Sequence, residues 1–208
     1  NQSKLKAIKS QMNPHFFYNA LNTIQSFILS NDKKQAVNYL SKFATLTRTI
    51  LEMTEKDLVS ITEEIKTLSL YLDIEKVRFN DDFNYEIFAD SNVDADNIKI
   101  PSMFLQPFVE NAVKHGLLHQ TEEKKLERVA DQIKISIDDN GIGRKKSQEL
   151  NQIKNNKHQS FATNAMQNRV NLLNQFTQKN ISIEYIDKQN QNNQSLGTTV
   201  VFVIPIIY

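Results

Sequence analysis

The chain has 208 residues and a net charge of +1, so it lacks the charge excess that draws a protein to nucleic acid or to a membrane surface. It contains no cysteine, which excludes disulfides, thiolate metal sites and cysteine nucleophiles. No apolar run approaches the ~18 residues of a membrane-spanning helix. Because the chain starts at Asn1 within a helical pattern, we expect it to be a fragment, which a membrane or sensor portion could precede.

The first part of the chain is predicted to be helical. Apolar side chains recur every three or four positions over residues 3–29, where Pro14 predicts a kink or a restart of the helix. Residues 30–32 predict a turn and an N-cap for a second helix over residues 33–53. The side chains expected to face inward from this second helix are Val37, Leu40, Ala44, Leu46 and Leu51.

A third helix is predicted to follow Ser60, which has capping-box spacing to Glu63, and to end near Phe79. Beyond Asn80 the pattern changes to alternating strands and helices, so we predict an α+β fold with a boundary there. The helices of the second part should cover one face of a mixed, mainly antiparallel sheet. Its expected strands are 83–88, 124–129, 132–138, 181–186 and 198–206, its expected helices 101–115 and 163–176, and its expected surface loop 188–195.

Glycine is rare in this chain and clustered. The chain has 4 glycines, where average usage of roughly 7% would give about 15. Gly116, Gly141 and Gly143 all lie in two short strings that also contain Asn, Lys and Asp residues. Because glycine permits positive φ and a close approach of backbone to ligand, this clustering predicts a nucleotide pocket.

Asp139 is the candidate carboxylate of that pocket. It ends an alternating strand just before Gly141 and Gly143, where it could accept a hydrogen bond from an exocyclic amine such as adenine N6. A tight turn with an N-cap explains the same string when it is taken alone. A calcium loop does not, because Gly141 at position 6 would put Ser136 and Ser147 at positions that need carboxylates.

The other string, residues 110–116, lies on a predicted helix. Asn111, Lys114 and His115 are three and four positions apart, so they can share a face. The amide oxygen of Asn111 could complete a magnesium shell, and Lys114 could contact phosphate. When the string is taken alone, a solvated helix end capped by Gly116 is the favoured interpretation.

Five segments, in this order along the chain, resemble one family. Residues 11–21 (QMNPHFFYNAL) resemble the phosphoacceptor segment of LytS/YehU-type sensor histidine kinases, and residues 64–79 also fit that family. Residues 106–116 (QPFVENAVKHG) look like the N box of the GHKL ATPase fold, and residues 139–143 (DNGIG) look like its first glycine box. Residues 197–200 (GTTV) resemble the last strand of the same fold.

The resemblance implies a protein histidine kinase that uses Mg-ATP. His15 would be the phosphoacceptor, although a helical histidine among aromatic residues is otherwise usually a packed side chain. Asn19, one turn later, could orient the imidazole or a water, or merely cap a packing interface. Glu110 is a candidate base, because Phe16 stands where other histidine kinases carry an acidic residue next to the histidine. The implied nucleotide contacts are Asn111 (also to magnesium through ATP), Lys114, His115, Gly116, Asp139, Gly141, Gly143, Ser160, Thr163 and Thr198.

The resemblance also implies an organisation and partners. Residues 1–80 would be the dimerisation and phosphoacceptor region, and residues 81–208 a GHKL-type ATP-binding domain with an α/β sandwich. Two helices from each chain would form a parallel or antiparallel four-helix arrangement in a homodimer. A cytoplasmic response regulator, of LytTR type by resemblance, would take the phosphoryl group on an aspartate. No direct nucleic-acid partner is expected, and a membrane would be reached only through an upstream segment.

The second glycine box departs from the family pattern. Residues 158–164 contain no glycine, so backbone amides at the start of the following helix, with the hydroxyls of Ser160 and Thr163, would have to bind the phosphates. Two alternatives stay open. The glycine-poor box favours a signalling scaffold of the same fold without turnover, and Glu110, which could orient water, favours a GHKL ATPase that forms no phosphohistidine.

Overall fold

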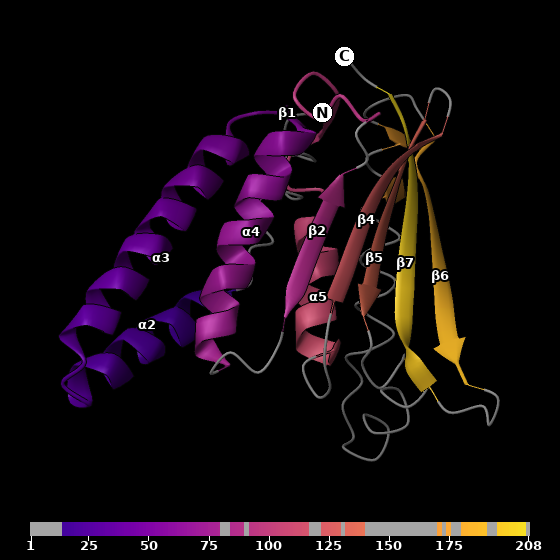
Figure 1. Cartoon of the computed structure of the whole chain (residues 1–208). Coiled ribbons are helices and arrows are strands. Elements are labelled where there is room, and N and C mark those ends of the chain that lie inside the picture. The colour runs from indigo at the N-terminus through magenta and orange to yellow at the C-terminus, as the bar shows by residue number, and fades with distance from the viewer. Residues whose placement is uncertain are drawn as a thin grey trace.

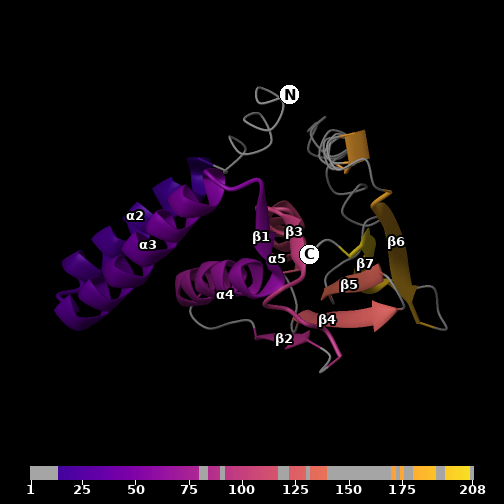
Figure 2. The same cartoon turned by 90° about the horizontal axis from the view of Figure 1, so that it is seen from above.

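The computed structural model shows an α+β chain with a helical hairpin on one side and a five-stranded sheet on the other (Figure 1). A further helix, α4 (Ile61–Arg78), lies between the hairpin and the sheet in both views (Figures 1 and 2). The residues that the structure describes are 14–79, 84–89, 92–116, 122–129, 132–139, 170–171, 174–175, 180–190 and 195–206.

The hairpin consists of α2 (Pro14–Leu29) and α3 (Lys33–Thr54), which pack side by side (Figure 1). Asp32 is the N-cap of α3, because its carboxylate accepts a hydrogen bond of 3.1 Å from the backbone N–H of Gln35. The predicted turn and N-cap are therefore confirmed. The helical pattern expected before residue 14 lies outside the described residues.

The inward face predicted for the second helix is wrong at four of its five positions. Leu46 is fully buried, but Val37, Leu40 and Leu51 are 64%, 49% and 62% exposed, and Ala44 is exposed as well. The face of α3 that packs inward carries Ala36, Tyr39, Leu46, Ile50 and Met53. The helix has two apolar stripes, and periodicity alone cannot tell which of them meets the rest of the chain.

The exposed stripe of α3 has a counterpart on α2. In both helices an exposed apolar residue follows directly after a buried one, as Leu21 follows Ala20 and Leu40 follows Tyr39. Consecutive side chains of a helix point about 100° apart. Because the two helices of the hairpin run antiparallel, the same rotation away from the buried face brings the exposed residues of both helices to the same side of the hairpin. We call this surface the outer stripe, and it comprises Tyr18, Leu21 and Ile28 of α2 with Val37, Leu40, Ala44 and Leu51 of α3.

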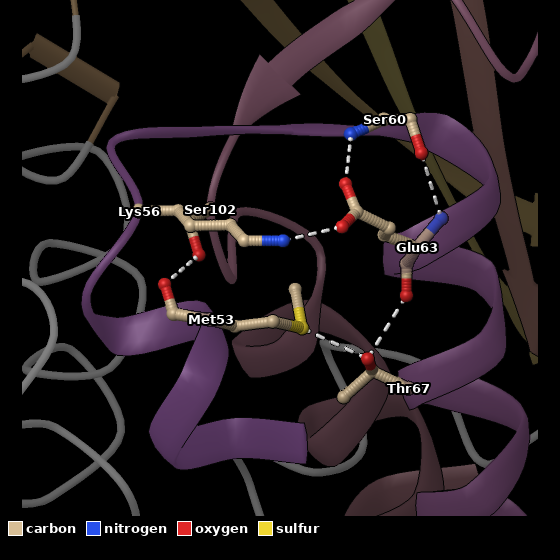
Figure 3. Close-up of polar contacts among 6 residues, drawn as sticks. All are labelled: Met53, Lys56, Ser60, Glu63, Thr67 and Ser102. Atoms are coloured by element: carbon tan, nitrogen blue, oxygen red, sulfur yellow. Dashed lines mark hydrogen bonds and ion pairs between the residues drawn. The ribbon is translucent and has the colours of Figure 1, made fainter.

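The predicted capping box begins α4. The hydroxyl of Ser60 accepts a hydrogen bond of 3.1 Å from the backbone N–H of Glu63, whose carboxylate accepts one of 2.8 Å from the N–H of Ser60 (Figure 3). The helix ends at Arg78 with Phe79 as its C-cap, as expected. Apolar periodicity and local capping chemistry therefore predicted this helix at both ends.

The helix predicted over residues 101–115 starts later than expected. Pro101 ends a short strand, β3 (Lys99–Pro101), which pairs antiparallel with β1 (Leu58–Ser60). Neither strand was predicted, because each has three residues and owes its position to the other. A tight turn with Met103 at φ 56° follows, and α5 runs over Gln106–Gly116.

The sheet has the strand order β2-β4-β5-β7-β6, and only the β2–β4 pair is parallel. The predicted mixed, mainly antiparallel sheet is therefore confirmed. Its core face carries Ile133, Ile135 and Ile137 of β5, as expected, and Phe202 of β7 packs on Phe108 of α5 at 4.5 Å between ring centroids. The strands are β2 (Tyr85–Ala89), β4 (Glu122–Val129), β5 (Gln132–Asp139), β6 (Ser182–Gln189) and β7 (Ser195–Pro205).

Some expected bounds shift or fall outside the described residues. The first strand begins at Tyr85, and β6 and β7 extend into the expected loop over residues 188–195. The helix expected over 163–176 is described only at 170–171 and 174–175, which are helical. The domain boundary near Asn80 stays a prediction. None of the helices in the described ranges is long and apolar enough to cross a membrane.

Candidate functional site

The candidate nucleotide site lies at one end of the sheet, the lower end in Figure 1, where β5 ends, β7 begins and α5 ends. Asp139 is the last residue of β5 and stands opposite Thr198 of β7. The backbone N–H of Thr198 donates a hydrogen bond of 3.3 Å to a carboxylate oxygen of Asp139. The structure therefore brings together two of the predicted contacts that lie 59 residues apart in sequence.

Strand alternation decides which way Asp139 faces. Ile133, Ile135 and Ile137 are buried on the α5 side of the sheet, so Asp139, two residues further on, shares their face. Its side chain is half-buried, while Thr198 is buried at 5% exposure. A carboxylate offers several acceptor positions, so a side chain of this type can accept hydrogen bonds from more than one donor.

Helix α5 supplies the other predicted contacts. Ala112 and Val113 are buried and hold the helix on the sheet, while Asn111 is half-buried. Glu110 is also half-buried, and its carboxylate accepts a hydrogen bond of 3.2 Å from the side-chain amide of Gln106. Packing on β5 therefore sets the position of the turn that carries Glu110 and Asn111.

Several predicted residues can be placed only in part. Lys114, His115 and Gly116 lie in the last turn of α5, but their side chains are outside what the structure describes. The predicted contacts that lie wholly outside the described residues are Gly141, Gly143, Ser160 and Thr163. Among the described ranges, no three His, Asp or Glu side chains converge as a metal site.

A second polar group at this end of the sheet was not predicted. Asp138 lies on the face opposite to Asp139, where Lys188 of β6 contacts its carboxylate at 2.8 Å and the Thr199 hydroxyl donates to it. The alternation of side chains along the predicted strand could have placed Asp138 and Asp139 on opposite faces of the sheet. The partners Lys188 and Thr199 could not be named before the strand order was known.

The candidate phosphoacceptor helix is anchored by aromatic residues. His15 lies in the first turn of α2, and its side chain is outside the described set. Phe16 is buried and packs on Tyr71 of α4, with ring centroids 5.1 Å apart, and on Phe43 of α3 at 6.1 Å. Asn19 is half-buried one turn after His15. The apolar residue after His15 therefore attaches α2 to α3 and α4.

Comparison with known proteins points to one class. Residues 3–83 match the family model described as histidine kinase. Among solved structures, the histidine kinase AdeS of Acinetobacter baumannii aligns with a TM-score of 0.48 and 12% identity, over 93% of this chain and 96% of AdeS. A structural likeness at that level carries no argument about the site.

Curated relatives identify the branch of the class. Sensor protein LytS of Staphylococcus haemolyticus (strain JCSC1435) is 30% identical over 145 residues, which are 68% of this chain and 24% of that protein. Sensor protein LytS of Streptococcus mutans serotype c is 31% identical over 217 residues, which are 99% of this chain and 34% of that protein. The chain belongs to the LytS-type sensor histidine kinases of two-component systems and spans about a quarter to a third of these relatives.

Proposed function

We propose that this chain is the cytoplasmic catalytic core of a sensor histidine kinase that phosphorylates itself on His15 and passes the phosphoryl group to an aspartate of a response regulator. The observation that carries the proposal is the convergence of Asp139, Thr198 and the carboxyl end of α5 at one end of the sheet. Family membership supports the phosphoacceptor helix, which precedes this site in the chain.

ATP fits the residues that meet there. A half-buried carboxylate suits the exocyclic amine of adenine as a hydrogen-bond acceptor, and Asp139 is half-buried beside Thr198. Asn111 would supply an amide oxygen to magnesium, which usually keeps waters and phosphate oxygens as its other ligands. Bound magnesium would neutralise developing charge on the phosphates.

The transfer itself needs one nucleophile and one leaving group. A ring nitrogen of neutral His15 attacks the γ-phosphorus of ATP, the bond from that phosphorus to the β–γ bridging oxygen breaks, and ADP leaves. The imidazole gains a P–N bond and loses its ring proton to a base, for which Glu110 is the candidate. In the second transfer an aspartate oxygen of the regulator replaces the imidazole on phosphorus.

The same proposal includes a homodimer, and the outer stripe supports it. Both helices of the hairpin carry exposed apolar residues, and their spacing of three, four and seven residues is the one used in helix bundles. A second copy would cover this surface with its own hairpin and complete a four-helix bundle.

The deciding experiment compares wild type with His15→Gln after incubation with ATP labelled on its γ-phosphate. Wild type should gain acid-labile label, and His15→Gln should gain none while it still binds Mg-ATP. His119→Gln, a histidine outside the motifs, is the matched control and should label normally. Acid-labile label in His15→Gln would contradict the assignment. Phosphate release that survives in this variant would identify an ATPase, and no wild-type binding at millimolar ATP would identify a scaffold.

A further inference from the structure

A buried carboxylate outside the predicted site contacts the turn that leads into α5. Glu64, on α4, is 1% exposed. Its two carboxylate oxygens accept hydrogen bonds of 3.0 Å and 2.9 Å from the backbone N–H groups of Met103 and Leu105. Bonds between a charged acceptor and backbone amides in a buried setting are among the stronger hydrogen bonds in proteins.

The position of these amides ties Glu64 to the candidate nucleotide helix. Leu105 directly precedes α5, and its carbonyl accepts the backbone N–H of Val109, the first bond of the helix ladder. Glu64 therefore acts as an N-terminal cap supplied by another helix, and its negative charge suits the positive end of the α5 dipole. Met103, at φ 56°, needs such a constraint because a non-glycine residue seldom takes this conformation.

The same turn is also attached to the end of α3. The hydroxyl of Ser102 donates a hydrogen bond of 2.7 Å to the carbonyl oxygen of Met53, and both groups are buried (Figure 3). The N–H of Ser102 donates to the carbonyl of Asp57 at 3.0 Å. The turn before α5 is therefore held from α3 and from α4, and Glu64 contributes a carboxylate to these contacts.

We infer that Glu64 is a positioning residue for the candidate nucleotide site. It fixes the start of α5 against α4 and thereby sets where Glu110 and Asn111 lie relative to Asp139. The inference rests on the proposed function insofar as α5 contacts ATP. A purely structural role predicts a lower unfolding midpoint alone, whereas a positioning role also predicts weaker nucleotide binding by molecules that remain folded.

The test uses Glu64→Gln in the full chain, because glutamine keeps the size of the side chain but offers one acceptor oxygen for two amides. Glu86→Gln is the matched control, since Glu86 is an exposed carboxylate on β2. Well below the unfolding midpoint, Glu64→Gln should bind a magnesium complex of a non-hydrolysable ATP analogue roughly tenfold more weakly, which corresponds to about 1.4 kcal/mol. Glu86→Gln should bind like wild type. Unchanged affinity in Glu64→Gln would overturn the inference.

A second measurement needs no nucleotide. Amide hydrogen exchange over residues 105–113 should be roughly tenfold faster in Glu64→Gln, while exchange in α2 stays at the wild-type rate. If wild type binds no nucleotide, the proposed function fails, and faster exchange confined to α5 still establishes that Glu64 positions this helix. Unchanged exchange over α5, or equal acceleration in α2 and α5, would refute the positioning role.

Discussion

Two buried carboxylates on α4 each accept hydrogen bonds from another part of the chain or from a nearby side chain. Glu64 meets backbone amides of the turn before α5, while Glu75, at 3% exposure, accepts a hydrogen bond of 3.0 Å from Arg78. The guanidinium of Arg78 also lies over the ring of Phe79 at 3.8 Å. Removal of Arg78 would leave the charge of Glu75 buried and uncompensated, and removal of Glu64 would take the acceptor away from two buried backbone N–H groups, so both changes should lower stability.

Tyr39 gives a pH-dependent prediction at the same scale. Burial raises the pKa of its phenol to about 12, an effect that the neighbouring Thr23 hydroxyl partly offsets, whereas an unfolded tyrosine titrates near pH ~10. The unfolded chain then loses the proton at lower pH than the folded one, so stability present below pH ~10 declines as pH rises toward ~12. The two-unit difference corresponds to at most about 2.7 kcal/mol.

The measurement is the free energy of unfolding in urea between pH ~8 and ~12. Tyr39→Phe should flatten part of the alkaline decline, because this variant lacks the phenol whose pKa burial raises. Tyr85 contributes to the remaining decline, since burial and its hydrogen bond to Asp73 raise its pKa as well. An alkaline decline as steep in Tyr39→Phe as in wild type would contradict this account.

At the scale of elements, we expect the two apolar faces of α3 to contribute to different processes, one to folding and the other to dimerisation. Leu46 is fully buried in the core, whereas Leu40 belongs to the outer stripe and is 49% exposed. The two leucines lie on one helix, six residues apart, yet they should influence different equilibria. Loss of a buried leucine side chain removes apolar contacts and leaves a cavity, while a charge on the stripe opposes burial against a second copy.

We therefore expect Leu46→Ala to lower the free energy of unfolding by about 2–5 kcal/mol. Leu40→Glu should instead convert a dimer to a monomer, as measured by light scattering on a sizing column. Asn38→Glu, an exposed position away from the stripe, is the control and should leave the dimer intact. A wild type that is already monomeric at high concentration, or a dimeric Leu40→Glu, would remove the outer stripe as the interface.

At the scale of the whole molecule, α4 is the element that joins the two sides. It packs on α3 and α2, through Phe16 and Tyr71 among others, and its Asp73 accepts a hydrogen bond from Tyr85 of the sheet. The hairpin, α4 and α5 therefore share one buried core with the sheet. Ligand binding at the sheet should consequently stabilise the chain against thermal unfolding as a unit.

Variants of the neighbouring residues Asp139 and Asp138 test this expectation, with Asp138 as the control. At a nucleotide concentration of 100 times the dissociation constant, Mg-ATP should stabilise wild type by about 2.7 kcal/mol, seen as a raised unfolding midpoint. Asp139→Asn should lose most of that shift, because Asp139 is the candidate carboxylate for adenine and lies on the α5 side of the sheet. Asp138→Asn should keep it, because Asp138 faces the opposite side of the sheet. Equal nucleotide shifts in the two variants would exclude Asp139 as the base-recognising residue.

The parts of the structure that depend on neighbouring residues along the chain are the ones that the sequence predicts best. The N-cap at Asp32, the capping box at Ser60 and the buried alternation of β5 were all predicted, because each follows from residues within a few positions. The pairing of β1 with β3 and the partners of Asp138 were missed. Each needs a segment that is distant in sequence, and local patterns hold no information about distance in space.

The sequence by itself determined the helices of the hairpin and α4, the alternating strands, and the motifs that indicate phosphoryl transfer, because period, caps and residue chemistry are local properties. Only the tertiary structure decided which stripe of α3 meets the core, that Pro101 ends a strand, and that Glu64 caps α5. Those outcomes depend on which apolar and polar surfaces become available when distant segments pack, and many arrangements satisfy the same local pattern.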